Sequence, residues 1–76
     1  KRGKDYKTLL QEYVQRDGDK HIVYRLLSES GPDHAKTFHM VVEINGVTYE
    51  AGSGKSKKIA EQHAAQLTLE KLMADK

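Results

Sequence analysis

The dipeptide Asn45-Gly46 constrains the fold of this chain more than any other short feature. It stands between residues 38–44, where Phe38 and Ile44 bound an alternating apolar run, and a second strand-like run at residues 47–51. Asn-Gly in this position favours a two-residue β-hairpin, because both residues accept the positive φ angles that such a turn requires. The sequence therefore predicts two antiparallel strands joined by a tight turn.

A helix and a further strand are expected before this hairpin. After Asp5, a suitable N-cap, apolar side chains recur at helical spacing up to Val14, and a turn cluster follows at residues 17–19. Residues 21–29 are rich in aliphatic side chains and predict a strand, although their alternation is irregular. Residues 31–34, Gly-Pro-Asp-His, then predict a turn or short loop.

A second helix is expected after the glycines at positions 52 and 54, with Ser56 as its N-cap. Its sheet-facing stripe would contain Ala64, Ala65, Thr68, Leu69 and Leu72. The order α-β-β-β-α predicts an α+β sandwich, in which a three-stranded antiparallel sheet carries two helices packed on one face. We expect the domain to cover residues 5–74, with the end of a linker at 1–4 and a tail at 75–76.

Composition limits the classes of function that are open to the chain. Its 76 residues make one small domain, and its lack of cysteine excludes disulfides and thiolate metal sites. The four histidines lack metal-ligand spacing, so we expect no metal site. No apolar run is long enough to span a membrane, and we expect a cytoplasmic location. The net charge of +2 allows a nucleic-acid partner without requiring one.

The triplet Gly54-Lys55-Ser56 resembles the end of a nucleotide-binding P-loop, but the rest of that motif is missing. A P-loop needs another glycine five positions before Gly54, and that position is Tyr49. The dinucleotide fingerprint fails as well, because Lys57 stands where its third glycine belongs. A nucleotide-triphosphate site is therefore excluded.

Three lysines gather where the second helix is expected to begin. Lys57 and Lys58 would lie in its first turn and Lys55 just before Ser56. Cations at a helix N-terminus are unfavourable by up to about 1 kcal/mol each, because the helix dipole is positive there. A bound phosphate would remove this conflict, since the exposed N–H groups, the dipole and the lysines would all face the same anion. A solvated surface run of charge is the alternative.

Two other surfaces could contact a ligand. Thr8, Gln11, Glu12 and Gln15 form a polar stripe on the first helix, opposite its apolar side, and the stripe lacks any cation. Such a stripe suits hydroxyl groups, for example the 2′-OH of RNA, although a solvated helix face looks similar. His34 would project outward from its turn, either as a contact residue or as a solvated side chain.

These stretches together resemble the double-stranded RNA-binding domain, and most closely the C-terminal domain of ribonuclease III. The resemblance rests on DYKTLLQEYVQ at 5–15, YRLLSESGPDHAKTF at 24–38 and GSGKSKKIAEQHAAQLTLEKL at 52–72. Relatives outside the ribonuclease III branch commonly carry a further lysine where Glu61 stands. We expect that difference to weaken phosphate contact slightly.

The resemblance implies three contacts with an A-form duplex, which is recognised by shape rather than by sequence. The polar stripe of the first helix would enter one minor groove, and the loop between the first two strands would reach the next. The cluster at the start of the second helix would grip phosphates across the major groove between them. The implied RNA-binding residues are Thr8, Gln11, Glu12, Gln15, Pro32, Asp33, His34, Lys55, Ser56, Lys57 and Lys58.

The resemblance also implies what the chain does not do by itself. The acidic signature of the ribonuclease III nuclease domain is absent, so we expect this chain to bind without cutting and without a cofactor, as a monomer. The parent protein would be a homodimeric, Mg²⁺-dependent endoribonuclease that processes double-stranded RNA, including ribosomal RNA. A protein-interaction module of the same fold, or a double-stranded RNA-binding domain from another RNA-processing protein, is the alternative.

Overall fold

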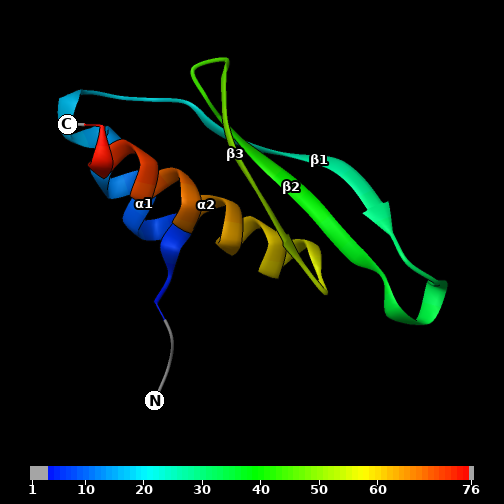
Figure 1. Ribbon diagram of the computed structural model, residues 1–76. Helices are drawn as coiled ribbons and strands as arrows, with labels where there is room; N and C mark the ends of the chain where they lie inside the picture. Colours follow the sequence, from blue (N-terminus) through cyan, green and yellow to red (C-terminus); the bar gives the residue numbers. More distant parts are fainter. Residues whose placement is uncertain (1–3, 76) are drawn as a thin grey trace.

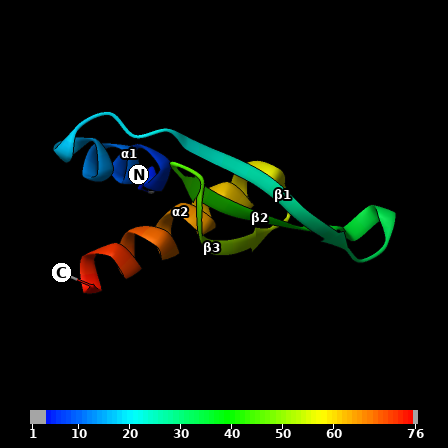
Figure 2. The same ribbon diagram turned by 90° about the horizontal axis from the view of Figure 1, so that it is seen from above.

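The computed structural model describes residues 4–75, so residues 1–3 of the expected linker and Lys76 of the expected tail lie outside the described part. Three antiparallel strands form one sheet in the order β1-β2-β3, and both helices pack on the same face of it (Figures 1 and 2). The α+β sandwich is therefore confirmed. The elements are α1 (Tyr6–Val14), β1 (Ile22–Ser30), β2 (Thr37–Ile44), β3 (Val47–Gly54) and α2 (Lys57–Ala74), with short 3-10 turns at Gln15–Asp17 and Asp33–Ala35.

Both helices begin at the residues that their caps predict. The Asp5 carboxylate accepts a hydrogen bond from the backbone N–H of Thr8 at 3.2 Å, and the Ser56 hydroxyl accepts one from Ile59 N–H at 3.1 Å. Each bond satisfies one of the N–H groups that a helix leaves unpaired in its first turn. The two caps therefore define where α1 and α2 start.

The hairpin between β2 and β3 has the expected turn. Asn45 and Gly46 have φ angles of 50° and 82°, the pair of positive values found in two-residue turns. β3 is longer than expected, however, because it continues to Gly54 instead of ending at residue 51. Gly52 pairs with Met40 and Gly54 with Phe38, so the glycines that were read as a connection belong to the sheet.

The irregular alternation of β1 comes from a β-bulge. Up to Leu26 the strand pairs regularly with β2, but Ser28 then pairs with His39, directly beside Met40, the partner of Leu26. Leu27 is the extra residue and is 49% exposed. One extra residue reverses the faces on which the following side chains lie. This explains why no single alternating pattern fits the strand.

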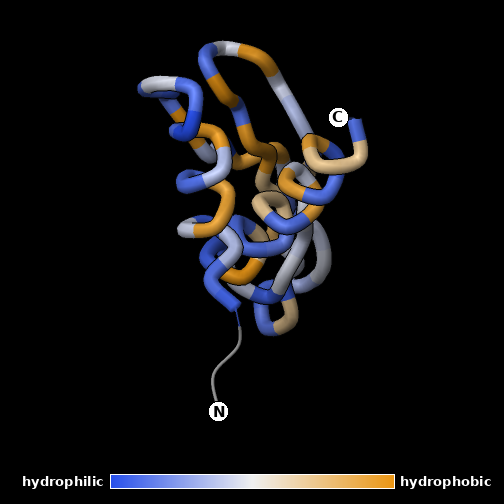
Figure 3. Tube along the Cα trace, turned by 90° about the vertical axis from the view of Figure 1, so that its left-hand side faces the viewer, coloured by the Kyte–Doolittle hydropathy of each residue, from blue (hydrophilic) through white to orange (hydrophobic). Residues whose placement is uncertain are grey.

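The core lies between the helices and the sheet. Leu10 of α1 packs with Val42 and Ile44 of β2 and with Ala64 and Ala65 of α2, all of them buried. Figure 3 shows hydrophilic and hydrophobic stretches alternating along the helices, as expected when only one side of each helix is buried. Because the alanine side chains are small, α2 can lie close to the sheet.

Two side chains of α2 also protect the outer edge of β3. The N–H of Glu50 donates to Thr68 Oγ1 at 3.2 Å, and the N–H of Ser53 donates to His63 Nδ1 at 3.0 Å. Unpaired N–H groups on an edge strand are open to pairing with another chain. Here side chains of α2 accept hydrogen bonds from two of these N–H groups. They hold β3 against α2.

Gly52 is the position where this close packing leaves no room. A Cβ atom there would overlap the backbone nitrogen of Ala64 and lie 2.6 Å from the carbonyl carbon of His63. We expect Gly52→Ala to lower the free energy of unfolding by about 3 kcal/mol, because backbone cannot move aside as a flexible side chain can. Urea unfolding followed by circular dichroism measures the change. Ala51→Ser, at the exposed neighbouring position, is the control, and equal stability of the two variants would contradict the packing described here.

Candidate nucleic-acid interface

The lysine cluster, which consists of Lys55, Lys57 and Lys58, surrounds the start of α2. β3 ends at Gly54 and α2 begins at Lys57, so only two residues connect the strand to the helix. The Ser56 cap fixes this connection, and the three lysine side chains are exposed around it. The cluster is therefore held by the sheet on one side and by the helix on the other.

No lysine of the cluster forms an ion pair among the described residues, and Glu61, one turn farther along α2, is paired with Lys7 instead. Within residues 4–75, the ion pairs join Lys7 to Glu61, Arg25 to Glu43, Lys36 to Glu29 and Lys71 to Asp75, and none includes a cluster lysine. The first turn of α2 also has no acidic residue. The cations and the positive end of the helix dipole are therefore not neutralised within the described chain, which makes this end of α2 suited to an anion.

The loop between β1 and β2 is exposed but internally ordered. Pro32, Asp33 and His34 are exposed, and the Pro32 carbonyl accepts a 2.9 Å hydrogen bond from Ala35 N–H. At the base of the loop, Lys36 Nζ lies 3.0 Å from a Glu29 carboxylate oxygen and ties the two strands together. The loop and one lysine of the cluster line a common hollow, which is formed by residues 33–38 and Lys55.

The polar stripe on α1 divides into two parts. Thr8, Gln11 and Glu12 are exposed, and within residues 4–75 the side chains of Gln11 and Glu12 make no hydrogen bond, whereas Thr8 bonds to the Asp5 carboxylate beside it. Gln15 was expected on this helix but begins the 3-10 turn that follows α1; it is half-buried, and its amide donates to the Lys20 carbonyl at 3.0 Å and accepts from the Lys20 N–H at 2.8 Å. Gln15 therefore stabilises the turn that follows α1, and contact with a ligand would compete with those two bonds.

The three surfaces lie in a row. In Figures 1 and 2, the start of α2 lies between α1 at one end of the molecule and the β1–β2 loop at the other. The domain is 42 Å long, so the two outer surfaces are well separated. A linear ligand with anionic groups in its middle section could touch all three.

Comparison with known families is decisive at this point. The family described as "Double-stranded RNA binding motif" matches residues 6–72. The chain belongs to this family. The match covers α1, all three strands and all but the last two residues of α2, and it confirms the resemblance inferred from the motifs.

Two ribonucleases are similar to this double-stranded RNA binding motif. Ribonuclease 3 of Streptococcus mutans is 57% identical over 68 residues, which make up 90% of this chain and 29% of that protein. Ribonuclease 3 of Streptococcus pyogenes serotype M3 is 52% identical over 71 residues, or 93% of this chain and 31% of that protein. The chain thus spans less than a third of the length of these relatives.

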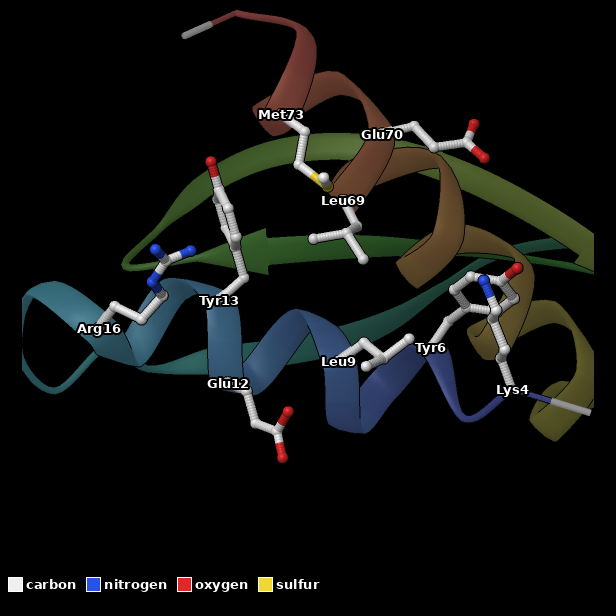
Figure 4. A pocket seen from close by; sticks show the side chains of 9 residues that line it. All are labelled: Lys4, Tyr6, Leu9, Glu12, Tyr13, Arg16, Leu69, Glu70 and Met73. Atoms are coloured by element: carbon white, nitrogen blue, oxygen red, sulfur yellow. The ribbon is translucent and has the colours of Figure 1, made fainter.

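An apolar groove between the helices of this motif was not foreseen from the sequence. It has a volume of about 530 Å³ and runs between α1 and the C-terminal half of α2 (Figure 4). Leu9 and Met73 line it and are 37% and 55% exposed. Helical spacing places Leu9 on the apolar side of α1, but the divergence of the two helices leaves it at the surface. The groove has no cluster of cations and does not suit a phosphate chain.

Two further features concern the expectations about metal and membrane. Residues 4–75 contain no group of three His, Asp or Glu side chains placed to hold a metal ion. In the same part of the chain, neither helix is both long and apolar enough to cross a bilayer.

Substitutions at Ser56 can test the anion site while the helix cap is kept. Ser56→Asp should keep the cap and the folding stability, because Asp is as good an N-cap as Ser and its charge suits the helix dipole. The same charge should repel a phosphate and weaken binding to duplex RNA. Fluorescence anisotropy and thermal unfolding measure the two effects, and the neutral cap Ser56→Asn is the control. Equal RNA affinity of the Asp and Asn variants would show that no phosphate lies at the helix start.

Proposed function

We propose that this chain binds double-stranded RNA through three separate surfaces and serves as the RNA-binding part of a ribonuclease III. The observation that carries the proposal is the position of the lysine cluster, without carboxylate partners, between α1 and the β1–β2 loop. In an A-form duplex, phosphates border the deep major groove and 2′-hydroxyls line the minor grooves on both sides of it. Along the domain, the cationic lysine cluster likewise lies between two surfaces without a cation cluster, the polar stripe of α1 and the β1–β2 loop.

The lysine cluster would supply the attraction to the phosphate backbone. Each lysine that neutralises a phosphate releases a counterion, so affinity falls as salt rises. The Ser56 cap places the lysines without using their charges, and the exposed N–H groups of the first turn add to the positive potential. This surface would hold the duplex but would not distinguish RNA from DNA.

The two outer surfaces would provide that distinction. Gln11 and Thr8 carry groups that donate and accept hydrogen bonds, as a 2′-hydroxyl does, whereas Glu12 can only accept. On the opposite side, Pro32, Asp33 and His34 would reach the next minor groove. Contacts with sugars carry little sequence information, so the domain would read the shape of the duplex.

The activity of the whole protein is part of the same proposal. The Ribonuclease 3 relatives support a parent that is an endoribonuclease. Cleavage of ribosomal RNA precursors and a cytoplasmic location are further parts of the proposal. We propose that the parent's catalytic acids, its Mg²⁺ and its homodimer contacts belong to the part of the relatives' length that this chain does not span. Within residues 4–75, no three acidic or histidine side chains converge on a metal position, so this chain would contribute binding alone.

Removing two lysines of the cluster tests the phosphate role. We expect Lys57→Ala with Lys58→Ala to weaken binding to duplex RNA and duplex DNA, and to reduce the slope of log K against log salt by about 1.5 to 2. Filter binding at several salt concentrations measures the slope. Lys71→Ala, near the C-terminal end of the same helix, is the matched control because Lys71 already lies 3.8 Å from Asp75. An unchanged slope in the double variant would contradict the phosphate contact.

Gln11 tests the hydroxyl role. We expect Gln11→Ala to weaken binding to duplex RNA by about tenfold, the equivalent of one net hydrogen bond, and to leave duplex DNA binding unchanged because DNA lacks the 2′-OH. The salt slope should stay that of the wild type, since no counterion is involved. Titration of the same variant with duplex RNA, duplex DNA and single-stranded RNA makes the comparison. Tight binding of the wild type to the single strand would contradict recognition of duplex shape, and no binding to any of the three would favour a protein-interaction module of the same fold.

A further inference from the structure

The two helices are joined by a polar clamp, formed by residues 5–7 of the α1 start and by Glu61 and Gln62 of α2. Lys7 Nζ lies 2.6 Å from a Glu61 carboxylate oxygen. The Gln62 side chain accepts from the N–H of Tyr6 at 2.7 Å and donates to the Asp5 carboxylate at 2.8 Å. All of these contacts join segments more than 50 positions apart in the sequence.

The clamp is built from groups that α1 itself needs. Tyr6 N–H is one of the donors that a helix start leaves unpaired, and here α2 supplies its acceptor. Gln62 also strengthens the N-cap, because its hydrogen bond, together with those from Thr8, lowers the pKa of Asp5 below its usual range. The start of α1 is therefore capped partly by its own residue and partly by the neighbouring helix.

The clamp extends to the sheet through Tyr24. Lys7 Nζ lies 4.7 Å above the centre of the Tyr24 ring, within the range of a cation–π contact. Burial raises the pKa of the Tyr24 hydroxyl to about 12, and the charges of Glu61 and Asp5 add to the rise. One lysine thus links α1, α2 and β1 at the same point.

Beyond the clamp, the helices separate. Leu10 packs on Ala64 and Ala65, and apolar contact with such small side chains has little directional preference. Farther along, the open groove lies between Leu9 and Met73, and Figure 4 shows α2 rising away from α1 toward its C-terminus. The angle between the helices is therefore restrained by directional bonds mainly at the clamp end.

We propose that Glu61 and Gln62 are positioning residues that hold the polar stripe of α1 at a set distance and angle from the lysine cluster. The inference rests on the proposed function, in which both surfaces contact one duplex. Glu61 lies one turn after the cluster on the same helix, so the residue that anchors α1 is in a fixed relation to Lys57 and Lys58. Movement of α1 would place Gln11 out of register with the minor groove while the lysines stayed on phosphate.

A positioning role and simple electrostatics predict opposite changes in RNA affinity when Glu61 is neutralised. A carboxylate near a phosphate site repels RNA, so its removal should strengthen binding if charge were its only effect. A positioning role requires the opposite result, because the released helix loses contacts that need exact placement. The sign of the change in affinity therefore separates the two explanations.

The test compares Glu61→Gln with Glu70→Gln in the chain as given. Both changes are on α2 and make the domain equally more positive, but Glu70 bonds only to Gln66 of its own helix within the described residues. Anisotropy titrations would use an RNA duplex of about 20 base pairs, longer than the roughly 16 that this class of domain spans, and one of about 8 base pairs. We expect Glu61→Gln to lose about tenfold in affinity for the longer duplex, the equivalent of one or two hydrogen bonds, and not to lose affinity for the shorter one. Thermal unfolding should change little, because a partly exposed ion pair contributes little stability.

A charge exchange provides the second test. Lys7→Glu with Glu61→Lys keeps the net charge and can restore the ion pair, whereas Glu61→Lys alone makes the domain more positive but places two lysines together. We expect the exchange to bind the longer duplex more tightly than the single variant. Tighter binding by the single variant, or equal affinities of Glu61→Gln and Glu70→Gln, would overturn the inference. Failure of the wild type itself to bind the longer duplex would overturn the proposed function and the inference with it.

Discussion

The close approach of α2 to β3 is the constraint on which the rest of this structure depends. Gly52 has no side chain at the point where the backbone of Ala64 crosses it, and the buried face of α2 there is built from alanine and threonine. This contact determines the height and direction of α2 above the sheet. Because only two residues join β3 to α2, it also determines where the lysine cluster lies. The position of the lysine cluster thus follows from a glycine and small side chains at the contact between β3 and α2.

The same region shows a conflict between stability and binding. Three lysines at a helix start oppose the dipole, and no carboxylate among residues 4–75 compensates them. The Ser56 cap and the packing beneath it offset this cost within the fold. An anion that binds there relieves the repulsion instead of creating a new cost. The unfavourable charges are therefore consistent with a site whose ligand completes the local electrostatics.

Much of the fold could be predicted because it depends on local chemistry. Asp5, Ser56 and Asn45-Gly46 each act on neighbouring residues, and each occurs where expected. The end of β3 was misplaced because Gly52 and Gly54 are typical of turns, and only the helix above them explains glycine inside a strand. The candidate site was partly predictable for the same reason. Lysines at a helix start are visible in sequence, whereas the bonds of Gln15 to Lys20 and the exposure of Leu9 depend on how the elements meet.

The clamp between α1 and α2 gives Glu61 a contact that its charge alone does not predict. A glutamate at this position provides one phosphate contact fewer than the lysine that other relatives carry there. In the folded domain Glu61 is the partner of Lys7, and its neighbour Gln62 caps α1. Recognition of duplex shape depends on the distance between surfaces, and no single surface can encode a distance. Residues that set the distance between two surfaces therefore affect specificity without touching the ligand, and a carboxylate beside a phosphate site contributes more to recognition through the helix it anchors than its charge takes away.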